Sequence, residues 1–200
     1  MDFSSETIQI VVALAAGVSL SASCGFRVFV PPLIVSLAAL AGMVDLSPDL
    51  AWLGTWPAAI AFGSAALVEV AAYYIPALDN LLDTISVPAA TLAGTLLTAA
   101  MLGVDIPPAA RWILALIAGG GTALAVSSAT ATARGASTVT TAGLANPVLS
   151  TGELAASAGL SVMSILLPLL ALVLALILVI ALVRWRSRRR TSHATQGPGN

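Results

Sequence analysis

The run LSVMSILLPLLALVLALILVIALV at residues 160–183 carries no charged side chain, and it decides what kind of fold the chain can form. As a helix this run measures about 36 Å, which exceeds the roughly 30 Å of a bilayer's hydrocarbon core. Other charge-free runs cover residues 28–44, 50–68, 84–104 and 112–133. Their hydropathy is continuous, without the period-two alternation of a membrane β-barrel. We therefore expect an all-α polytopic membrane protein.

The composition of the chain supports this class. Of its 200 residues, 58% are hydrophobic and only 8% are charged, against roughly 25% charged residues in ordinary soluble domains. So few charges exclude a typical soluble enzyme, a nucleic-acid-binding protein and a disordered chain. The single cysteine, Cys24, excludes an intrachain disulfide and a cysteine-based metal motif. The acidic start lacks the basic region of a signal peptide, so we expect residues 7–20 to remain as a helix.

Apolar runs bounded by proline, serine and aspartate predict about six or seven transmembrane helices, some of them short or broken. Residues 31–44 and 147–156 would form helices of only about 21 Å and 15 Å, too short to span a bilayer. The polar segments before them would then enter the membrane, as in transporters whose broken helices surround a central site. The alternative is that these helices are tilted, re-entrant or longer, with the polar segments as surface loops. The predicted helices are residues 7–20, 31–44, 50–76, 88–103, 109–126, 147–156 and 160–184, and the polar segments are residues 21–30, 77–87 and 128–146.

The order of short motifs predicts an internal repeat of helix pairs with a period of about 57–60 residues. Val30-Pro31 recurs as Val87-Pro88, and Val44-Asp45 recurs as Val104-Asp105. Each unit consists of a polar segment, a short helix that starts at proline, an acidic turn and a long helix. The units are residues 21–77, 78–134 and a degraded third copy, 138–185.

The distribution of arginine predicts the orientation in the membrane. All eight basic residues are arginines, and five of them lie within residues 184–190. If all seven helices cross, Arg27 and Arg134 lie on the same side as this segment, and only Arg111 lies opposite. The positive-inside rule then places the C-terminus in the cytoplasm and the N-terminus outside. If residues 147–156 do not cross, the N-terminus moves inside.

The same analysis predicts the domain organisation and the surroundings of the protein. We expect a single transmembrane domain over residues 1–185 and an Arg-rich, disordered cytoplasmic tail over residues 186–200. Lysine is absent and alanine is abundant, which is typical of GC-rich bacterial genomes, so we expect the bacterial inner membrane. The expected partners are the lipid bilayer and a small ion or solute, and nucleic acid is excluded. So small a bundle would also allow a homodimer.

Glu69 and Arg27 are the first candidate site residues. Glu69 lies in an apolar run, where an ionised carboxylate is costly and should face the protein interior or be protonated. Tyr73 lies one turn further on the same helical face. Glu69 is thus a candidate proton- or cation-linked acid, with Arg27 as its countercharge or as an anion contact. The alternatives are that Glu69 only pairs with Arg27, and that Arg27 is a cytoplasmic anchor.

A second group of candidates follows the tyrosine pair at residues 73–74. Asp79 and Asp83 are four residues apart and share a helical face, and Asn80 lies beside Asp79. Carboxylate and amide oxygens are hard ligands that suit a cation. The alternative is an amphipathic interfacial helix with Asp79 as its N-cap and the tyrosines in the aromatic belt.

The third group is Asn146 and Glu153, which lie in an otherwise apolar stretch. Ser150 and Glu153 fit a capping box, a purely structural explanation, but Glu153 could also face a cavity. Residues 119–121, three glycines, indicate helix packing or a hinge, because the remaining parts of a phosphate-binding loop are absent. No catalytic triad, zinc motif or dinucleotide fingerprint is present, and we expect no cofactor.

Three stretches carry a resemblance to a known family. They are SCGFRVFVP at residues 23–31, YYIPALDNLLDT at residues 73–84 and LANP at residues 144–147. With these motifs the chain resembles the bacterial integral membrane family known as domain of unknown function 4126, over roughly residues 8–183. The resemblance implies a small integral membrane protein, and it implies no activity, substrate or site residue.

Three functions remain open at this stage. The first is a small transporter or channel-like protein with an acidic polar cavity for a cation or a proton-coupled small solute. The second is a structural or accessory membrane protein in which the polar groups only satisfy one another. The third, the weakest, is an enzyme that acts on a lipid substrate.

Overall fold

The computed structural model describes the backbone of residues 3–73, 76–103, 106–141 and 144–194. Within these ranges it describes all side chains except those of residues 3–4, 76–81, 83, 183 and 185–194. The described chain is helical and contains no strand. The elements are α1 (Phe3–Cys24), α2 (Val30–Leu40), the 3-10 helix η1 (Pro48–Gly54), α3 (Trp56–Ala72), α4 (Pro76–Met101), α5 (Pro108–Leu114), the π-helical stretch η2 (Ala115–Gly120), α6 (Gly121–Thr141), α7 (Asn146–Leu166) and α8 (Pro168–Ala194).

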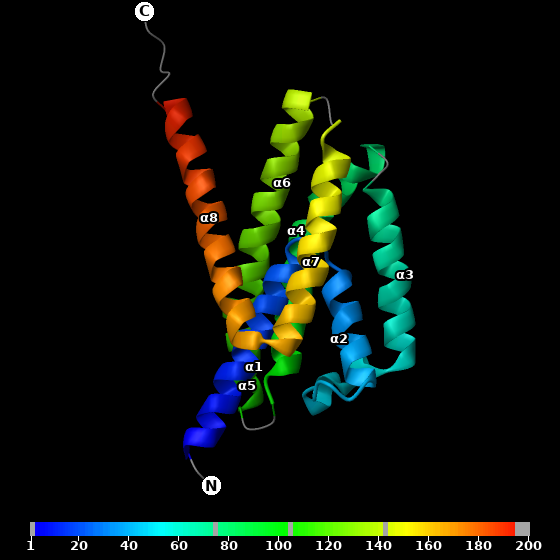
Figure 1. Cartoon of the computed structure of the whole chain (residues 1–200), viewed down its shortest axis with the longest axis vertical. Helices are drawn as coiled ribbons and strands as arrows, with labels where there is room; N and C mark the ends of the chain where they lie inside the picture. The colour runs from blue at the N-terminus through cyan, green and yellow to red at the C-terminus, as the bar shows by residue number, and fades with distance from the viewer. Residues whose placement is uncertain (1–2, 74–75, 104–105, 142–143, 195–200) are drawn as a thin grey trace, which may run out of the picture.

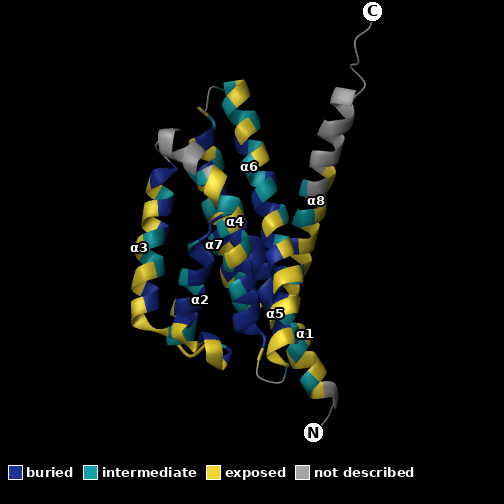
Figure 2. Cartoon of the chain, turned by 180° about the vertical axis from the view of Figure 1, so that it is seen from behind, coloured by how far each residue is buried: buried dark blue, intermediate teal, exposed yellow. Residues whose placement is uncertain are grey.

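The helices form a bundle in which successive long helices run in opposite directions, and the start of α1 and the end of α8 lie at opposite ends (Figure 1). The segment α5–η2–α6 is one continuous rod. Helix α1 is central and packs against α4, α6, α7 and α8. Its second half is buried from Ala15 to Cys24, and the deeply buried part of the bundle surrounds it (Figure 2). Helix α3 lies at the edge and packs mainly on α2.

Proline sets the start of most of these helices. Proline occupies one of the first two helical positions of α2, α3, α5 and α7, where its missing N–H would have no partner within the helix and its φ angle is already helical. Thr55 adds a side-chain cap to α3 by accepting a hydrogen bond from the Ala58 N–H at 3.4 Å. Pro88 is the exception, because it lies inside α4.

Helix α2 ends early because of a glycine. Gly42 has a φ of 69°, the left-handed conformation that glycine adopts most readily. The Gly42 N–H donates to Ala39 O at 3.0 Å and the Met43 N–H donates to Ala38 O at 2.9 Å, the bond pattern of a Schellman motif. The predicted helix 31–44 is therefore even shorter than expected.

Within the described residues, four helical segments are long and apolar enough to cross a membrane. The pair η1 and α3, which is bent by 63°, would be a fifth if it counts as one span. Helix α2 and the apolar part of α8 are shorter. These helices indicate a membrane protein, while six or seven crossings and the internal repeat are not established by the fold. The four segments are Ser5–Cys24, Thr84–Met101, Pro108–Thr141 and Asn146–Leu166.

Several predicted boundaries were wrong. The polar segments 77–87 and 128–146 are mostly helical, within α4 and α6. In the part of the chain that the structure describes, residues 25–29, between α1 and α2, form a break of the expected kind. Helix α7 continues to Leu166 and is not a ten-residue fragment. Helix α8 reaches Ala194, through much of the predicted tail, and the division into domain and tail stays a prediction.

Candidate functional site: a buried charge cluster

The break between α1 and α2 turns the chain back inside the bundle (Figure 1). At Gly25 the chain passes so close to α6 that an added Cβ would lie 2.5 Å from the Val126 Cβ. The backbone N–H groups of Val28 and Phe29 lie just before α2 and have no acceptor within the helix. Glu69 of α3 accepts both hydrogen bonds, with its Oε1 2.7 Å from Val28 N and its Oε2 3.1 Å from Phe29 N.

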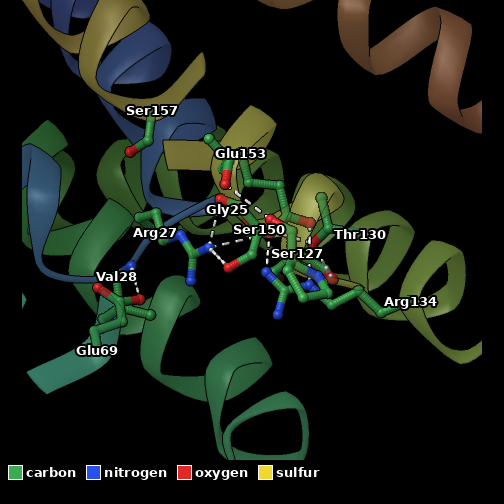
Figure 3. A network of polar contacts seen from close by, with 12 residues as sticks. Gly25, Arg27, Val28, Glu69, Ser127, Thr130, Arg134, Ser150, Glu153 and Ser157 are labelled. Atoms are coloured by element: carbon green, nitrogen blue, oxygen red, sulfur yellow. Dashed lines mark hydrogen bonds and ion pairs between the residues drawn. The ribbon is translucent and has the colours of Figure 1, made fainter. Parts of the chain in front are cut away.

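A second carboxylate, Glu153 of α7, binds two arginines. Arg134 of α6 donates to both of its oxygens, with Nε 3.1 Å from Oε1 and Nη2 on Oε2. The Nη2 of Arg27 lies 3.7 Å from Glu153 Oε2 and also donates to the backbone oxygen of Ser150 at 2.7 Å. Figure 3 shows these side chains converging from the α1–α2 turn, α6 and α7, with Glu69 beside them.

Tyr73, at the end of α3, joins the two arginines. The guanidinium carbons of Arg27 and Arg134 lie 4.0 Å and 3.8 Å from the centre of its ring, within the range of cation–π attraction. We call Arg27, Glu69, Tyr73, Arg134 and Glu153 the buried charge cluster. Each of them is at most 9% exposed. Its two arginines and two glutamates are electrically neutral when all four are ionised.

A small cavity adjoins the cluster beside Glu69, Tyr73 and Arg134. Thr130 and Ser86 also line it. The space open to the centre of a water molecule is about 10 Å³, which is enough for about one water. This cavity is therefore too small to hold a solute larger than water.

The structure brings together four of the residues predicted from sequence: Arg27, Glu69, Tyr73 and Glu153. Glu69 accepts hydrogen bonds from the backbone N–H groups that follow Arg27. The alternative stated above, that Glu69 only pairs with Arg27, does not include these bonds. Asn146 lies about two helical turns before Glu153 on α7, and its Nδ2 donates to Thr138 Oγ1 at 3.1 Å.

The other predicted residues have different outcomes. Asp79, Asn80 and Asp83 belong to α4, and their side chains lie outside the described residues. The capping box of Ser150 and Glu153 was wrong, because both residues lie inside α7 and the cap position is Ala145. Among the residues that the structure describes, no three His, Cys, Asp or Glu side chains are grouped to hold a metal ion.

Arg134 is the residue that the sequence analysis missed. It was counted only as a charge that orients the chain. The available signal was a lone arginine and a lone glutamate, Arg134 and Glu153, on consecutive helices in apolar surroundings, where each charge needs a partner.

A sequence model of the family described as Domain of unknown function (DUF4126) matches residues 14–188. The chain belongs to this family. The DUF4126 match spans every residue of the buried charge cluster. No curated protein and no solved structure gives a significant match to the chain.

Proposed function

We propose that this DUF4126 protein is a small transporter or channel-like protein whose working centre is the buried charge cluster, and that it carries a cation or a proton-coupled small solute. The observation that supports it is the meeting of four ionisable side chains inside the bundle, beside the non-helical turn at residues 25–29. Charges inside a membrane domain are expensive, and they mark ion pathways and proton relays. Non-helical backbone beside such charges is typical of transporter sites.

The chemistry of the cluster allows a switch between two states. Glu153 is shared by two arginines, so a proton or a bound cation at this carboxylate would weaken its hold on both of them. A buried arginine that loses its carboxylate is strongly unfavourable, so the helices that carry Arg27 and Arg134 would then shift. The cavity of about one water would correspond to the closed state in this cycle.

The finer topology is part of the same proposal. We propose six or seven membrane crossings, with α8 and α3 as full crossings and α2 as a short returning helix. The three repeat units would each supply a pair of oppositely directed segments. The arginine distribution supports a cytoplasmic C-terminus in the bacterial inner membrane. Asp79, Asn80, Asp83 and Asn146 are proposed further ligands, and a homodimer stays a prediction.

The test is flux through proteoliposomes with a panel of ions and small metabolites. The variant Arg134→Gln/Glu153→Gln removes both charges of the ion pair between α6 and α7 and retains amide groups for hydrogen bonding. We expect it to lose the flux of the wild-type protein. The matched control is Asp49→Asn/Arg111→Gln, which removes the ion pair between η1 and α5 at the other end of the bundle and should retain that flux.

One observation favours a second function. The carboxylate of Glu69 already has two hydrogen bonds and that of Glu153 has two arginines, so the cluster could serve only to fix the α1–α2 turn. In that case the folded wild-type protein carries none of the solutes, and the protein is a structural or accessory component of the membrane.

A further inference from the structure

Helix α7 has an unusual buried face. Its exposed large side chains are apolar, among them Val148, Val162 and Leu166. If this face served only for packing, small apolar residues such as alanine would let neighbouring helices approach closely, and no polar group would have to lose its contact with water. On α7 every described buried residue is polar. We call this set the polar seam of α7: Asn146, Ser150, Glu153, Ser157, Ser161 and Ser164.

The polar seam is nearly as long as a bilayer core is thick. From Asn146 to Ser164 the helix rises about 27 Å, against roughly 30 Å of hydrocarbon. Helix α7 packs on α1 and α2, and Ser157 Oγ donates to Ser23 O of α1 at 3.0 Å. The seam therefore runs through the interior of the bundle, between α7 and the helices that carry the break.

The two ends of the seam meet different features. At one end Ser150 and Glu153 contact the arginines of the buried charge cluster. At the other end Ser164 lines a groove of about 310 Å³ between α1 and the junction of α7 with α8. A second groove, of about 180 Å³, shares Gln9 and Met101 with the first and contains the carboxylate residue Glu6.

One hydroxyl of the seam, about one turn before its Ser164 end, is left without a hydrogen bond. Ser161 is fully buried, and within the described part of the chain its Oγ has no partner. Ser157 and Ser164 donate to backbone oxygens, as serines in membrane helices commonly do. A buried hydroxyl that lacks a partner is unfavourable, and a transient ligand that coordinates its oxygen would satisfy it.

We infer that the polar seam of α7 is the route along which a monovalent cation crosses between the groove at Ser164 and the buried charge cluster. This inference rests on the proposed transport function and adds its path and its ion. Hydroxyl, amide and carboxylate oxygens are hard ligands for such ions. A divalent ion is disfavoured, because sites for calcium are built from several carboxylates and the seam has only Glu153. The two arginines of the buried charge cluster do not exclude a cation, because Glu69 and Glu153 balance their positive charges.

The first test asks whether water reaches the seam at Ser161, between Ser164 and the buried charge cluster. Ser161→Cys is made in a Cys24→Ala background and treated in proteoliposomes with a positively charged, membrane-impermeant methanethiosulfonate. Such reagents react only with a thiolate that water reaches. If the seam is a hydrated route, we expect Ser161→Cys to be modified, and high sodium or potassium should slow the modification. The neighbour Val162→Cys, on the lipid-facing side, should not react. Absence of modification at Ser161→Cys, or equal modification at both positions, overturns the route.

The second test measures flux of radiolabelled sodium and rubidium. Ser161→Ala deletes the hydroxyl without breaking a described hydrogen bond, so folding should be preserved. We expect its cation flux to fall at least tenfold, while Val162→Ala retains wild-type flux. If Ser161→Ala keeps full flux while Arg134→Gln/Glu153→Gln loses it, the route is wrong and the proposed function stands. If the folded wild-type protein carries neither sodium nor rubidium but carries another solute of the panel, the route is wrong and the proposed function stands. If it carries none of them, both are wrong.

Discussion

At the scale of single residues, the arginines and glutamates of the buried charge cluster lie in apolar surroundings that offer few partners for a charge. Arg27, Glu69 and Glu153 could be selected from sequence because an isolated charge in an apolar run must find a partner or a function. Their geometry could not be predicted. Which carboxylate meets which arginine depends on how α3, α6 and α7 pack, and the binding of Glu69 to backbone N–H groups has no sequence pattern at all.

The ion pair between Arg134 and Glu153 gives a first prediction, because removing one of its charges differs from removing both. Glu153→Gln leaves Arg134 buried beside a neutral amide, and the loss of one partner of a buried pair typically costs about 3–5 kcal/mol. Arg134→Gln/Glu153→Gln should be less destabilised than this single variant, because one uncompensated charge is gone. Thermal unfolding of purified protein in detergent measures the difference. Equal unfolding temperatures for the two variants would contradict the pairing.

Glu69 gives a second prediction. Glu69→Gln keeps one side-chain oxygen for the N–H groups of Val28 and Phe29, whereas Glu69→Ala removes both acceptors. Each buried N–H that loses its acceptor costs about 1–3 kcal/mol, so Glu69→Ala should unfold at the lower temperature. Asp45→Ala, which removes an exposed carboxylate, is the control and should have a smaller effect than Glu69→Ala. The account fails here if both Glu69 variants match the wild type.

At the scale of elements, the sequence predicted the short α2 and the break before it, but it misplaced the helices in the polar segments. Residues 128–141 are rich in threonine and serine, which suggests a loop in a soluble protein. In α6 their hydroxyls donate to the carbonyl one turn earlier, as Thr132 does to Ser128 at 2.7 Å and Thr138 to Arg134 at 3.0 Å. Bonded in this way, hydroxyl side chains stay inside a membrane helix.

The contact between α4 and η2 gives a third prediction. A Cβ added at Gly119 would lie 2.2 Å from Thr98 Oγ1 and 2.8 Å from the backbone oxygen of Gly94, so these two elements would have to separate. Gly119→Ala should lower the unfolding free energy by about 1–3 kcal/mol. Gly121→Ala, two residues away, meets nothing within 4 Å and should leave stability unchanged or raise it by up to about 1 kcal/mol. Equal effects of the two changes would contradict the described packing.

At the scale of the whole molecule, composition and hydropathy were sufficient for the class of protein, but not for the number of crossings. Charge-free runs reveal apolar helices. Whether a bent pair such as η1 and α3, or a short helix such as α2, crosses the membrane depends on how it packs against its neighbours. The start of α1 and the end of α8 lie at opposite ends of the bundle (Figure 1), and an odd number of crossings would place them so.

The orientation is a fourth prediction. A reporter fused after residue 200 that is active only in the cytoplasm, such as a fluorescent protein that folds there, should be active. A reporter that needs the periplasm, such as alkaline phosphatase, should be inactive at the same position. The reverse pattern would place the arginines of the C-terminal segment outside and would contradict the proposed topology.

The central claim is that the buried charge cluster moves charge across the membrane. The most direct measurement is the current that purified protein generates on a solid-supported membrane after a jump in sodium, potassium or proton concentration. We predict a current for the wild-type protein and for Asp49→Asn/Arg111→Gln, and none for Arg134→Gln/Glu153→Gln. The same current from all three proteins, or none from the folded wild type, would contradict the account.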